Sequence, residues 1–470
     1  MKKMYGITAL LLALALLLSS CAGSTTATVV STEASTGAST AAHTTAKTTA
    51  ATAKPKPWEI DENVNFRGET FTFALLTDYE NVKGLGICDI GGETEGTYAS
   101  NVNEYARERN EYIYETFNGK TEMVKMSAAS LASELEAGKC KVDFVYAPHG
   151  AVNTGYCYDV ESIGIDLTLP WWNAAITRIS EGGKNYAIAA CFNVETYYSL
   201  EAIFFNKDVK EKIPSLKDWD FYELVYENKW TIDKLIEISR LAYSEADVCG
   251  FFTEKNAVSA LYFASGQSFI SETVNGGETT FVNGFNDTAK AVTDKLIDVF
   301  GDASVKTGER AEISDALMNG KALFIKAKIG DMSCFAEEYL NCGVMPLPCT
   351  VKNGEFPGGL LSADAPFIFA LKSGASPEYM RYYLWYTSHF SGGTIYRDFL
   401  NLHKYQYTTD TDSATMVDMC INFPVVYDAA CRGGWADAEE KYITAVLAGE
   451  NPVEKFRTEL YPQLEAKARE

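Results

Sequence analysis

Histidine is scarce in this chain, and its scarcity excludes several kinds of site. The 470 residues include four histidines. His43 lies in a low-complexity segment, which leaves His149, His389 and His403 for the rest of the chain. We therefore expect no multi-histidine metal site, and a Ser/His/Asp triad has few candidates. No cofactor is expected either.

The cysteines lack the spacing of a metal or redox motif. None of the eleven forms a C-x-x-C pair, which excludes zinc-ribbon and thioredoxin-like sites. Outside the cell they could form disulfides, or they could remain small buried hydrophobic residues. The sequence leaves both alternatives open.

Excess positive charge and nucleotide or calcium motifs are also missing. The net charge of −22 argues against nucleic acid and anionic lipid headgroups as partners, because both require a basic face. Gly84-Leu85-Gly86 lacks the spacing of a dinucleotide fingerprint. Asp410-Thr411-Asp412 lacks the glycine and terminal glutamate of a calcium loop.

The N-terminus has the pattern of a bacterial export signal. Lys2 and Lys3 precede an apolar run from Ile7 to Leu18, which is too short to cross a bilayer as a helix. Leu18-Ser19-Ser20-Cys21 resembles a lipobox, so we predict a signal peptide over residues 1–20 and lipid on Cys21. The alternative is an ordinary signal peptide followed by a chance cysteine.

Residues 21–65 are predicted to form the acylated cysteine and a disordered tether. Ala22 to Pro57 consists almost entirely of Thr, Ala and Ser, which cannot bury a core. Such a tether would reach ~30–35 Å. No other segment approaches a transmembrane span, so we expect an extracytoplasmic protein anchored to the outer face of the cell membrane by its lipid.

From Phe66 onward, predicted strands and helices alternate, which indicates an α/β fold. The expected strands are Phe71–Leu76, Val142–Tyr146, Ile203–Asn206 and Ala322–Ile325. The expected helices are Asn103–Phe117, ending at Gly119, one capped by Thr231, Ile313–Met318, and one beginning at Asn451-Pro452.

Several segments together resemble bacterial extracellular solute-binding proteins of family 1, the maltose-binding type that serves carbohydrate ABC transporters. Individually weak, they occur in the family's order over about Asn101 to the C-terminus. The resemblance is carried by Asn103–Asn110, Asp166–Asn173, Ala202–Asp208, Tyr222–Val225 with Lys229–Leu235, Asn319–Phe324, Gly343–Pro348 and Gly358–Leu371.

The resemblance implies a two-lobed periplasmic-binding-protein-like (type II) fold with discontinuous lobes and an interlobe cleft. The expected N-terminal lobe is 66–195 plus about 365–420, and the C-terminal lobe is about 196–364 plus 421–470. It also implies a non-catalytic monomer that captures a mono- or oligosaccharide by hinge closure and delivers it to ABC permease subunits.

Aromatic residues are the first candidates for the ligand site, because sugars stack their ring faces on aromatic planes. Trp171 and Trp172 follow Pro170 in a short turn, and at least one is expected to line the cleft; the alternative is a packing role. Trp435 follows Arg432-Gly433-Gly434, and the resemblance implies a stacking aromatic there.

Polar candidates would bind hydroxyl groups. Asp78 and Tyr79 follow the first strand, where α/β sheets bind ligands. Either Tyr197 or Tyr198 is expected to face the cleft, and Tyr198 is the preferred candidate. For Gln267 and Asp364, the alternative is a polar surface loop.

Two other functions stay open at this point. A binding protein for another solute (peptide, polyamine or polyol) would have more charged residues and fewer exposed aromatics in its cleft. A surface glycoside hydrolase would need a carboxylate pair at catalytic separation, and the mere presence of 63 acidic residues does not indicate one.

Overall fold

The computed structural model describes residues 61, 63–79, 82, 90–91, 101–177, 180–338, 340–348, 358–425 and 435–469. The predicted signal peptide, Cys21 and nearly all of the tether lie outside these ranges. The described residues all belong to one compact unit, Pro55–Glu470. Across these ranges, no helix combines the length and the apolar character that a membrane crossing requires.

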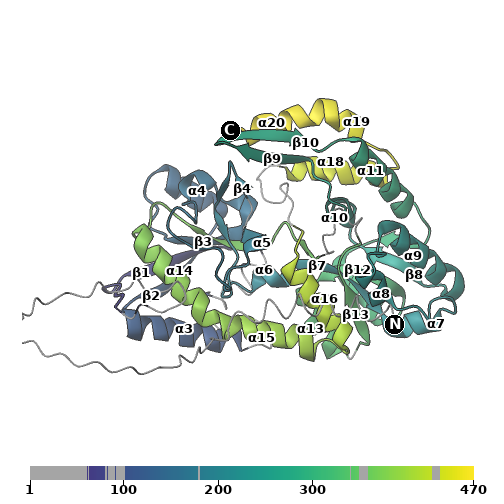
Figure 1. The fold of residues 1–470 in the computed structure, drawn as a ribbon, viewed down its shortest axis with the longest axis horizontal. Helices are drawn as coiled ribbons and strands as arrows, with labels where there is room; N and C mark the ends of the chain where they lie inside the picture. Colours follow the sequence, from purple (N-terminus) through teal and green to yellow (C-terminus); the bar gives the residue numbers. More distant parts are fainter. Residues whose placement is uncertain are drawn as a thin grey trace, which may run out of the picture. The chain divides into compact units, whose positions relative to one another are not determined.

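The first lobe is built on a five-stranded sheet of order β2-β1-β3-β15-β6. Figure 1 labels its strands β1, β2 and β3. Strands β1, β2 and β3 are parallel, whereas β15 runs antiparallel to both β3 and β6. The strands are β1 (Thr70–Leu76), β2 (Lys120–Met126), β3 (Phe144–Pro148), β6 (Ala187–Ile188) and β15 (Pro366–Ala370), and the helices are α3 (Val102–Phe117), α4 (Ala128–Glu136), α5 (Ala174–Thr177), α14 (Pro377–Gly392) and α15 (Ile395–Asn401).

Alternation along β1 divides its side chains between two cores. Phe71, Phe73 and Leu75 pack with α14, where the ring of Tyr383 stacks on Phe71 at a centroid distance of 4.1 Å. Ala74 and its neighbours on the other face belong to the larger core. Because alternate side chains enter two different cores, β1 is covered on both faces.

The second lobe is built on a sheet of order β11-β8-β12-β7-β13, with β14 paired to β7. Its strands are β7 (Leu200–Asn206), β8 (Cys249–Thr253), β11 (Val305–Thr307), β12 (Ala322–Lys328), β13 (Cys342–Met345) and β14 (Leu360–Leu361). Its helices are α7 (Lys207–Lys212), α8 (Phe221–Tyr226), α9 (Ile232–Ala246), α10 (Ala257–Ala264), α11 (Asp287–Phe300), α12 (Arg310–Met318), α13 (Met332–Glu337), α16 (Thr411–Asn422), α18 (Ala436–Leu447), α19 (Val453–Lys455) and α20 (Tyr461–Ala468).

Three chain segments cross between the two sheets. The first leads from β6 through α6 (Glu195–Tyr198) into β7, and the second leads from β14 into β15. These two crossings touch, because the Ser362 N–H donates to the Ser199 carbonyl at 3.2 Å.

The third crossing lies nearer the N-terminus than we expected. It follows α15 through the π-helical turn Leu402–Gln406. Helix α16 already packs against β7 and β13 of the second sheet. The boundary proposed at about residue 420 therefore moves to the start of α16.

Local signals account for several helix ends. Thr231 caps α9 by accepting the Lys234 N–H, as predicted. Helix α3 ends at Asn118, which takes the left-handed conformation with φ 54°. Gly119 is required for a different reason: a Cβ there would lie 2.6 Å from the ring of Phe66. The predicted stop signal is thus an asparagine C-cap followed by a close approach.

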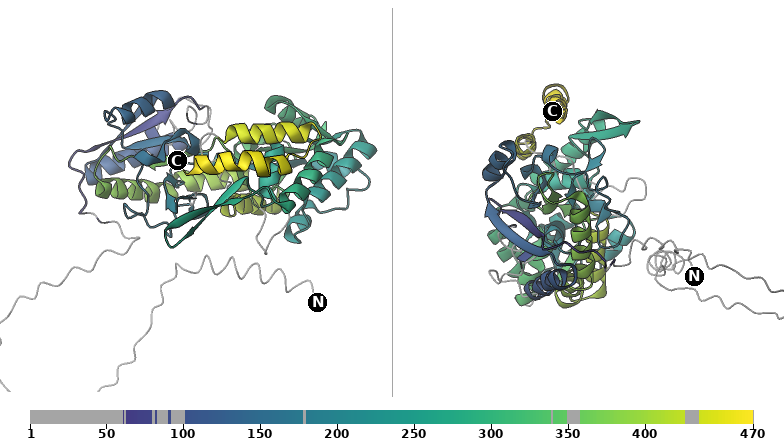
Figure 2. Two further views of the ribbon diagram at one scale, coloured as in Figure 1. Left: turned by 90° about the horizontal axis from the view of Figure 1, so that it is seen from above. Right: turned by 90° about the vertical axis from the view of Figure 1, so that its left-hand side faces the viewer.

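A hairpin from each lobe contacts the other. The first lobe contributes β4 (Ser180–Glu181) and β5 (Lys184–Asn185), and the second contributes β9 (Ile270–Asn275) and β10 (Glu278–Asn283) (Figures 1 and 2). The Gly182 N–H in the β4–β5 turn donates to Glu272 Oε2 of β9 at 3.2 Å. We call this the hairpin contact.

Candidate functional site

A cavity of about 420 Å³ lies at one edge of the second sheet, beside the second crossing. Its walls come from the carboxyl end of β12, the start of β7, the crossing segment Leu360–Asp364, and the N-terminal parts of α10, α12 and α18. The carboxyl ends of parallel strands β8 and β12 meet at this edge, where α/β sheets bind their ligands. We call it the charged cavity.

A buried ion pair contributes to its wall. Lys326 Nζ of β12 lies 2.7 Å from Glu201 Oε1 of β7, and the side chains are 1% and 6% exposed. The two strands are antiparallel, with Lys326 opposite Ile203 and Lys328 opposite Glu201. Lys326 and Glu201 are therefore diagonal neighbours on one face, which explains how two strand residues reach each other.

A second ion pair joins the cavity to a crossing. Lys328 Nζ donates to both carboxylate oxygens of Asp364, at 2.9 and 2.8 Å. The Ser362 hydroxyl also donates to Asp364. Among the predicted site residues, Asp364 is the one that lines this cavity.

The helices contribute further carboxylates. Glu439 of α18 accepts the Ser259 hydroxyl of α10 at 2.5 Å. Burial raises the pKa of Glu439, and the neighbouring charges of Glu201 and Glu440 act in the same direction. On α12, Arg310 pairs with Asp331. The cavity therefore offers many charged hydrogen-bonding groups, and no aromatic residue is among its described lining residues.

A second cavity, of about 260 Å³, is lined by two of the aromatic residues considered for the ligand site, Trp172 and Tyr197. Trp172, Tyr197 and Tyr396 line it together with Asn173 and Asn422. It lies where the first crossing meets the ends of α15 and α16. We call it the aromatic cavity.

The structure buries both adjacent tryptophans. Trp171 and Trp172 are 7% and 5% exposed. The backbone here is extended, because the Cys191 N–H donates to the Trp171 carbonyl and the Asn173 N–H to the Ala189 carbonyl, both at 3.0 Å. Neighbouring residues of an extended pair face opposite sides. Trp171 packs edge-on against Trp385 of α14, while Trp172 faces the aromatic cavity.

Three more predicted residues are buried. Trp435 is 1% exposed and lies in the core at the start of α18. Gln267 is buried and donates to the Ser265 carbonyl at 3.0 Å. Tyr198 packs against Phe399 and His403. None of the three lines the charged cavity.

Asp78 and Tyr79 lie at the carboxyl end of β1, as predicted, but they serve the first lobe. Asp78 accepts the Ala128 N–H at 2.6 Å and so holds the start of α4. Tyr79 is partly buried, and burial followed by the Asp78 charge raises its pKa. Neither residue lines either cavity.

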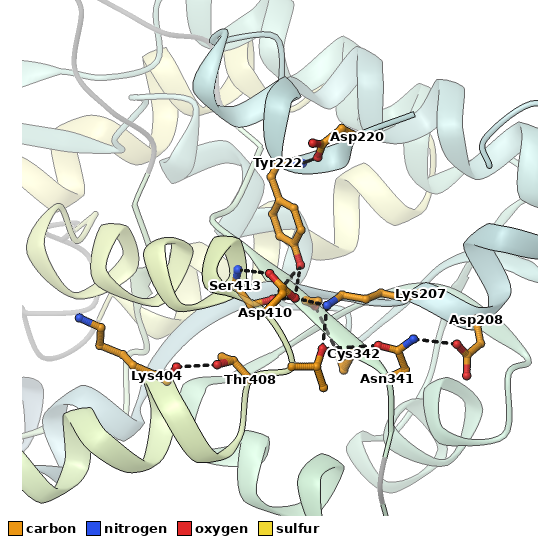
Figure 3. Close-up of polar contacts among 12 residues, drawn as sticks. Lys207, Asp208, Asp220, Tyr222, Asn341, Cys342, Lys404, Thr408, Asp410 and Ser413 are labelled. Carbon is orange, nitrogen blue, oxygen red and sulfur yellow. Dashed lines mark hydrogen bonds and ion pairs between the residues drawn. The ribbon is translucent and has the colours of Figure 1, made fainter. Parts of the chain in front are cut away.

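A polar cluster at the N-terminus of α16 holds this helix against the second lobe (Figure 3). Asp410 caps the helix by accepting the Ser413 N–H at 2.7 Å, and it pairs with Lys207. The Tyr222 hydroxyl lies 2.7 Å from the Ser413 hydroxyl. Because its members bind one another, the cluster ties α16 to α7 and α8 of the second lobe.

Sequence reasoning missed most of the charged cavity. Glu201 is the one charged residue of the buried strand Leu200–Asn206, and Lys326 and Lys328 alternate at the end of β12. Charges at period two on buried strands were a usable signal, because burying a charge requires a partner. Glu254 and Glu439 gave no such signal, since they lie among many acidic residues.

The described residues contain no group of three or more His, Cys, Asp or Glu side chains arranged to hold a metal ion. Seven of the cysteines are free thiols within the described ranges: Cys140, Cys157, Cys191, Cys249, Cys334, Cys342 and Cys420.

No family model matches the sequence, and no curated protein matches it either. Solved structures do. A cyclo/maltodextrin-binding protein in complex with maltotetraose aligns with a TM-score of 0.54 at 14% identity, covering 85% of this chain and 96% of that one.

Two further structures agree. The GacH receptor of Streptomyces glaucescens, solved unliganded and with acarbose, gives a TM-score of 0.52 at 13% identity, with 86% and 99% coverage. A family 1 extracellular solute-binding protein from Bifidobacterium longum subsp. infantis gives 0.53 at 12% identity, with 86% and 98% coverage. The chain therefore has the two-lobed periplasmic binding protein fold, as predicted.

Proposed function

We propose that this two-lobed protein is an extracytoplasmic lipoprotein that captures a carbohydrate without catalysis and delivers it to an ABC permease. The charged cavity carries the proposal. It lies at the sheet edge beside the crossings, so a ligand there would touch Asp364 on one crossing and Glu201 at the start of the strand that follows another. Binding would therefore bias the hinge.

The chemistry of the cavity suits hydroxyl groups. Carboxylates such as Asp364 and Glu439 accept hydrogen bonds, and Lys328 and Arg310 donate them. A volume of about 420 Å³ is at the lower end of the range of about 300–1,000 Å³ for ligand pockets. This size favours a mono- or disaccharide over a long chain. The similar structures that hold oligosaccharides support the assignment of the ligand class.

The sequence supports the remaining parts of the proposal. The lipobox at Cys21 and the Thr/Ala tether would hold the protein on the outer face of the membrane, with no other membrane contact and no nucleic acid partner. The ABC permease would be its protein partner, and the protein would act as a monomer.

A second candidate function follows from the charged cavity itself. Its described lining residues include charged groups and no aromatic residue, which is the composition expected for a polyol, polyamine or peptide site. This candidate shares the capture and delivery steps and differs only in the ligand.

Thermal unfolding with a panel of saccharides tests the main proposal. A ligand selective for the folded state raises the melting temperature. Ser314→Tyr on α12 would fill the charged cavity from its wall, and Asp315→Tyr is the matched control because Asp315 is exposed and does not line the cavity. We expect a sugar-dependent shift in the wild type and in Asp315→Tyr that Ser314→Tyr loses. A panel without any shift in folded protein would contradict the carbohydrate assignment.

A further inference from the structure

Each positive charge among the described lining residues of the charged cavity is paired with a carboxylate. Lys326 lies 2.7 Å from Glu201, Lys328 lies 2.8 Å from Asp364, and Lys255 lies 2.8 Å from Glu440. Arg310 pairs with Asp331. Among the described lining residues, each cation therefore already has a carboxylate partner, which an anionic ligand would have to share or displace.

Hydrogen-bond acceptors, by contrast, are in surplus. The described lining residues include six carboxylates and four cations, which leaves two negative charges among them. Glu254 is half-buried and forms no ion pair with the described residues. Nearby, Oδ1 of Asn256 is buried without a hydrogen-bond partner in the described structure. These groups would receive hydrogen bonds from a ligand.

Three helix N-termini border the cavity, and by themselves they would favour an anion. Each already has a carboxylate of the protein beside it. Glu254 precedes α10, Glu312 lies in the first turn of α12, and Glu439 lies in the first turn of α18. The helix dipoles therefore stabilise the negative charges of the protein's own carboxylates, and they do not create a vacant site for an anionic ligand.

We infer that the charged cavity admits neutral and cationic solutes and excludes anionic ones, so that among sugars it takes hexoses and hexosamines but not uronates. A hydroxyl or ammonium group can donate to Glu254 and Asn256. A uronate would place its carboxylate among the cavity's own carboxylates, with every described cation occupied. The inference rests on the proposed function in that the charged cavity must be the ligand site.

Calorimetric titration with charge-matched sugars tests this. The gluco, galacto and manno series each provide a hexose, a hexosamine and a uronate of the same ring size, and disaccharides extend the set. We expect at least one hexose or hexosamine to bind, with its uronate at least tenfold weaker. A uronate that binds as tightly as its neutral counterpart would overturn the inference while leaving carbohydrate capture intact.

Polyamines and polyols in the same panel separate the carbohydrate assignment from the exclusion of anionic solutes. If putrescine or spermidine binds and no sugar does, the carbohydrate assignment fails, but the inference that the cavity excludes anionic solutes stands. If nothing in the panel binds, the proposed function fails and the inference falls with it.

Glu254→Gln tests the contribution of one carboxylate to this charge preference, because the substitution keeps the shape of the side chain and removes its charge. A hydrogen bond to a charged group contributes about 1.5 kcal/mol, or about tenfold in affinity. We expect hexosamine binding to weaken by about tenfold relative to hexose binding. Glu278→Gln, on the exposed face of β10, is the control and should leave both unchanged. An unchanged hexosamine-to-hexose ratio in Glu254→Gln would contradict the inference.

Discussion

Removing one partner of the buried Lys326–Glu201 pair should destabilise the second lobe strongly. Lys326→Met keeps the length and apolar stem of the side chain but leaves the Glu201 carboxylate, which is 6% exposed, without its cation. Breaking a buried pair in this way costs about 3–5 kcal/mol, because an uncompensated charge remains buried.

The double variant Lys326→Met/Glu201→Leu separates the pair's net contribution from this penalty. With both charges gone, the strands retain an apolar diagonal neighbour pair, and such replacements are often neutral. We therefore expect the double variant to recover to within about 1 kcal/mol of the wild type. Both variants should lose ligand binding, since both residues line the charged cavity.

Lys255→Met is the matched control for burial. Its Nζ also lies 2.8 Å from a carboxylate, that of Glu440, but the two side chains are 60% and 56% exposed. An exposed pair contributes at most about 1 kcal/mol, so this substitution should change stability little. Urea unfolding gives the three free energies. A double variant as unstable as Lys326→Met, or a Lys255→Met variant equally unstable, would refute the reasoning.

Three further predictions concern the crossings and the lobes. Burial lowers the pKa of His403 to about 4. Between pH 6.5 and 4 only the unfolded chain binds a proton at this histidine, so the free energy of unfolding falls by up to about 3 kcal/mol as the pH is lowered. In His403→Phe, the free energy of unfolding measured with urea should depend less on pH over this range. The same pH dependence as in the wild type would contradict the low pKa of His403. Although burial opposes it, Lys207 and the Ser413 amide lower the pKa of Asp410. Asp410→Asn, which keeps a cap, should therefore lose about 1 kcal/mol at pH 7, a loss that disappears on acidification below the pKa of Asp410; a loss that persists at low pH would point to another cause. Glu272→Ala removes the acceptor of the hairpin contact, and calorimetry should show affinity about three- to tenfold weaker; unchanged affinity would mean that the contact does not favour the bound arrangement.

The alternating pattern of the sequence predicted the fold well. Strand β12 and helix α9 begin at the predicted residues because their apolar periodicity and caps are local signals. The family-like segment Gly358–Leu371 contains the second crossing, which carries Asp364. These signals depend on residues close together in the chain, so the sequence alone reveals them.

The ligand site was less predictable because burial depends on distant partners. The pairing of Trp171–Asn173 with Ala189–Cys191 decides that both tryptophans are covered. Likewise, Glu201 becomes a cavity residue only because β12 lies antiparallel to β7 and brings Lys326 to it. The composition of the sequence favoured aromatic residues as the ligand site, whereas strand pairing brings charged residues together at the charged cavity.

A crystal structure with the sugar that gives the largest thermal shift is the most direct measurement of ligand capture. The account predicts sugar density in the charged cavity, with hydroxyl groups within hydrogen-bond distance of Glu254 and Asp364. Density beside Trp172 and Tyr197 in the aromatic cavity, with the charged cavity free of sugar, would contradict it.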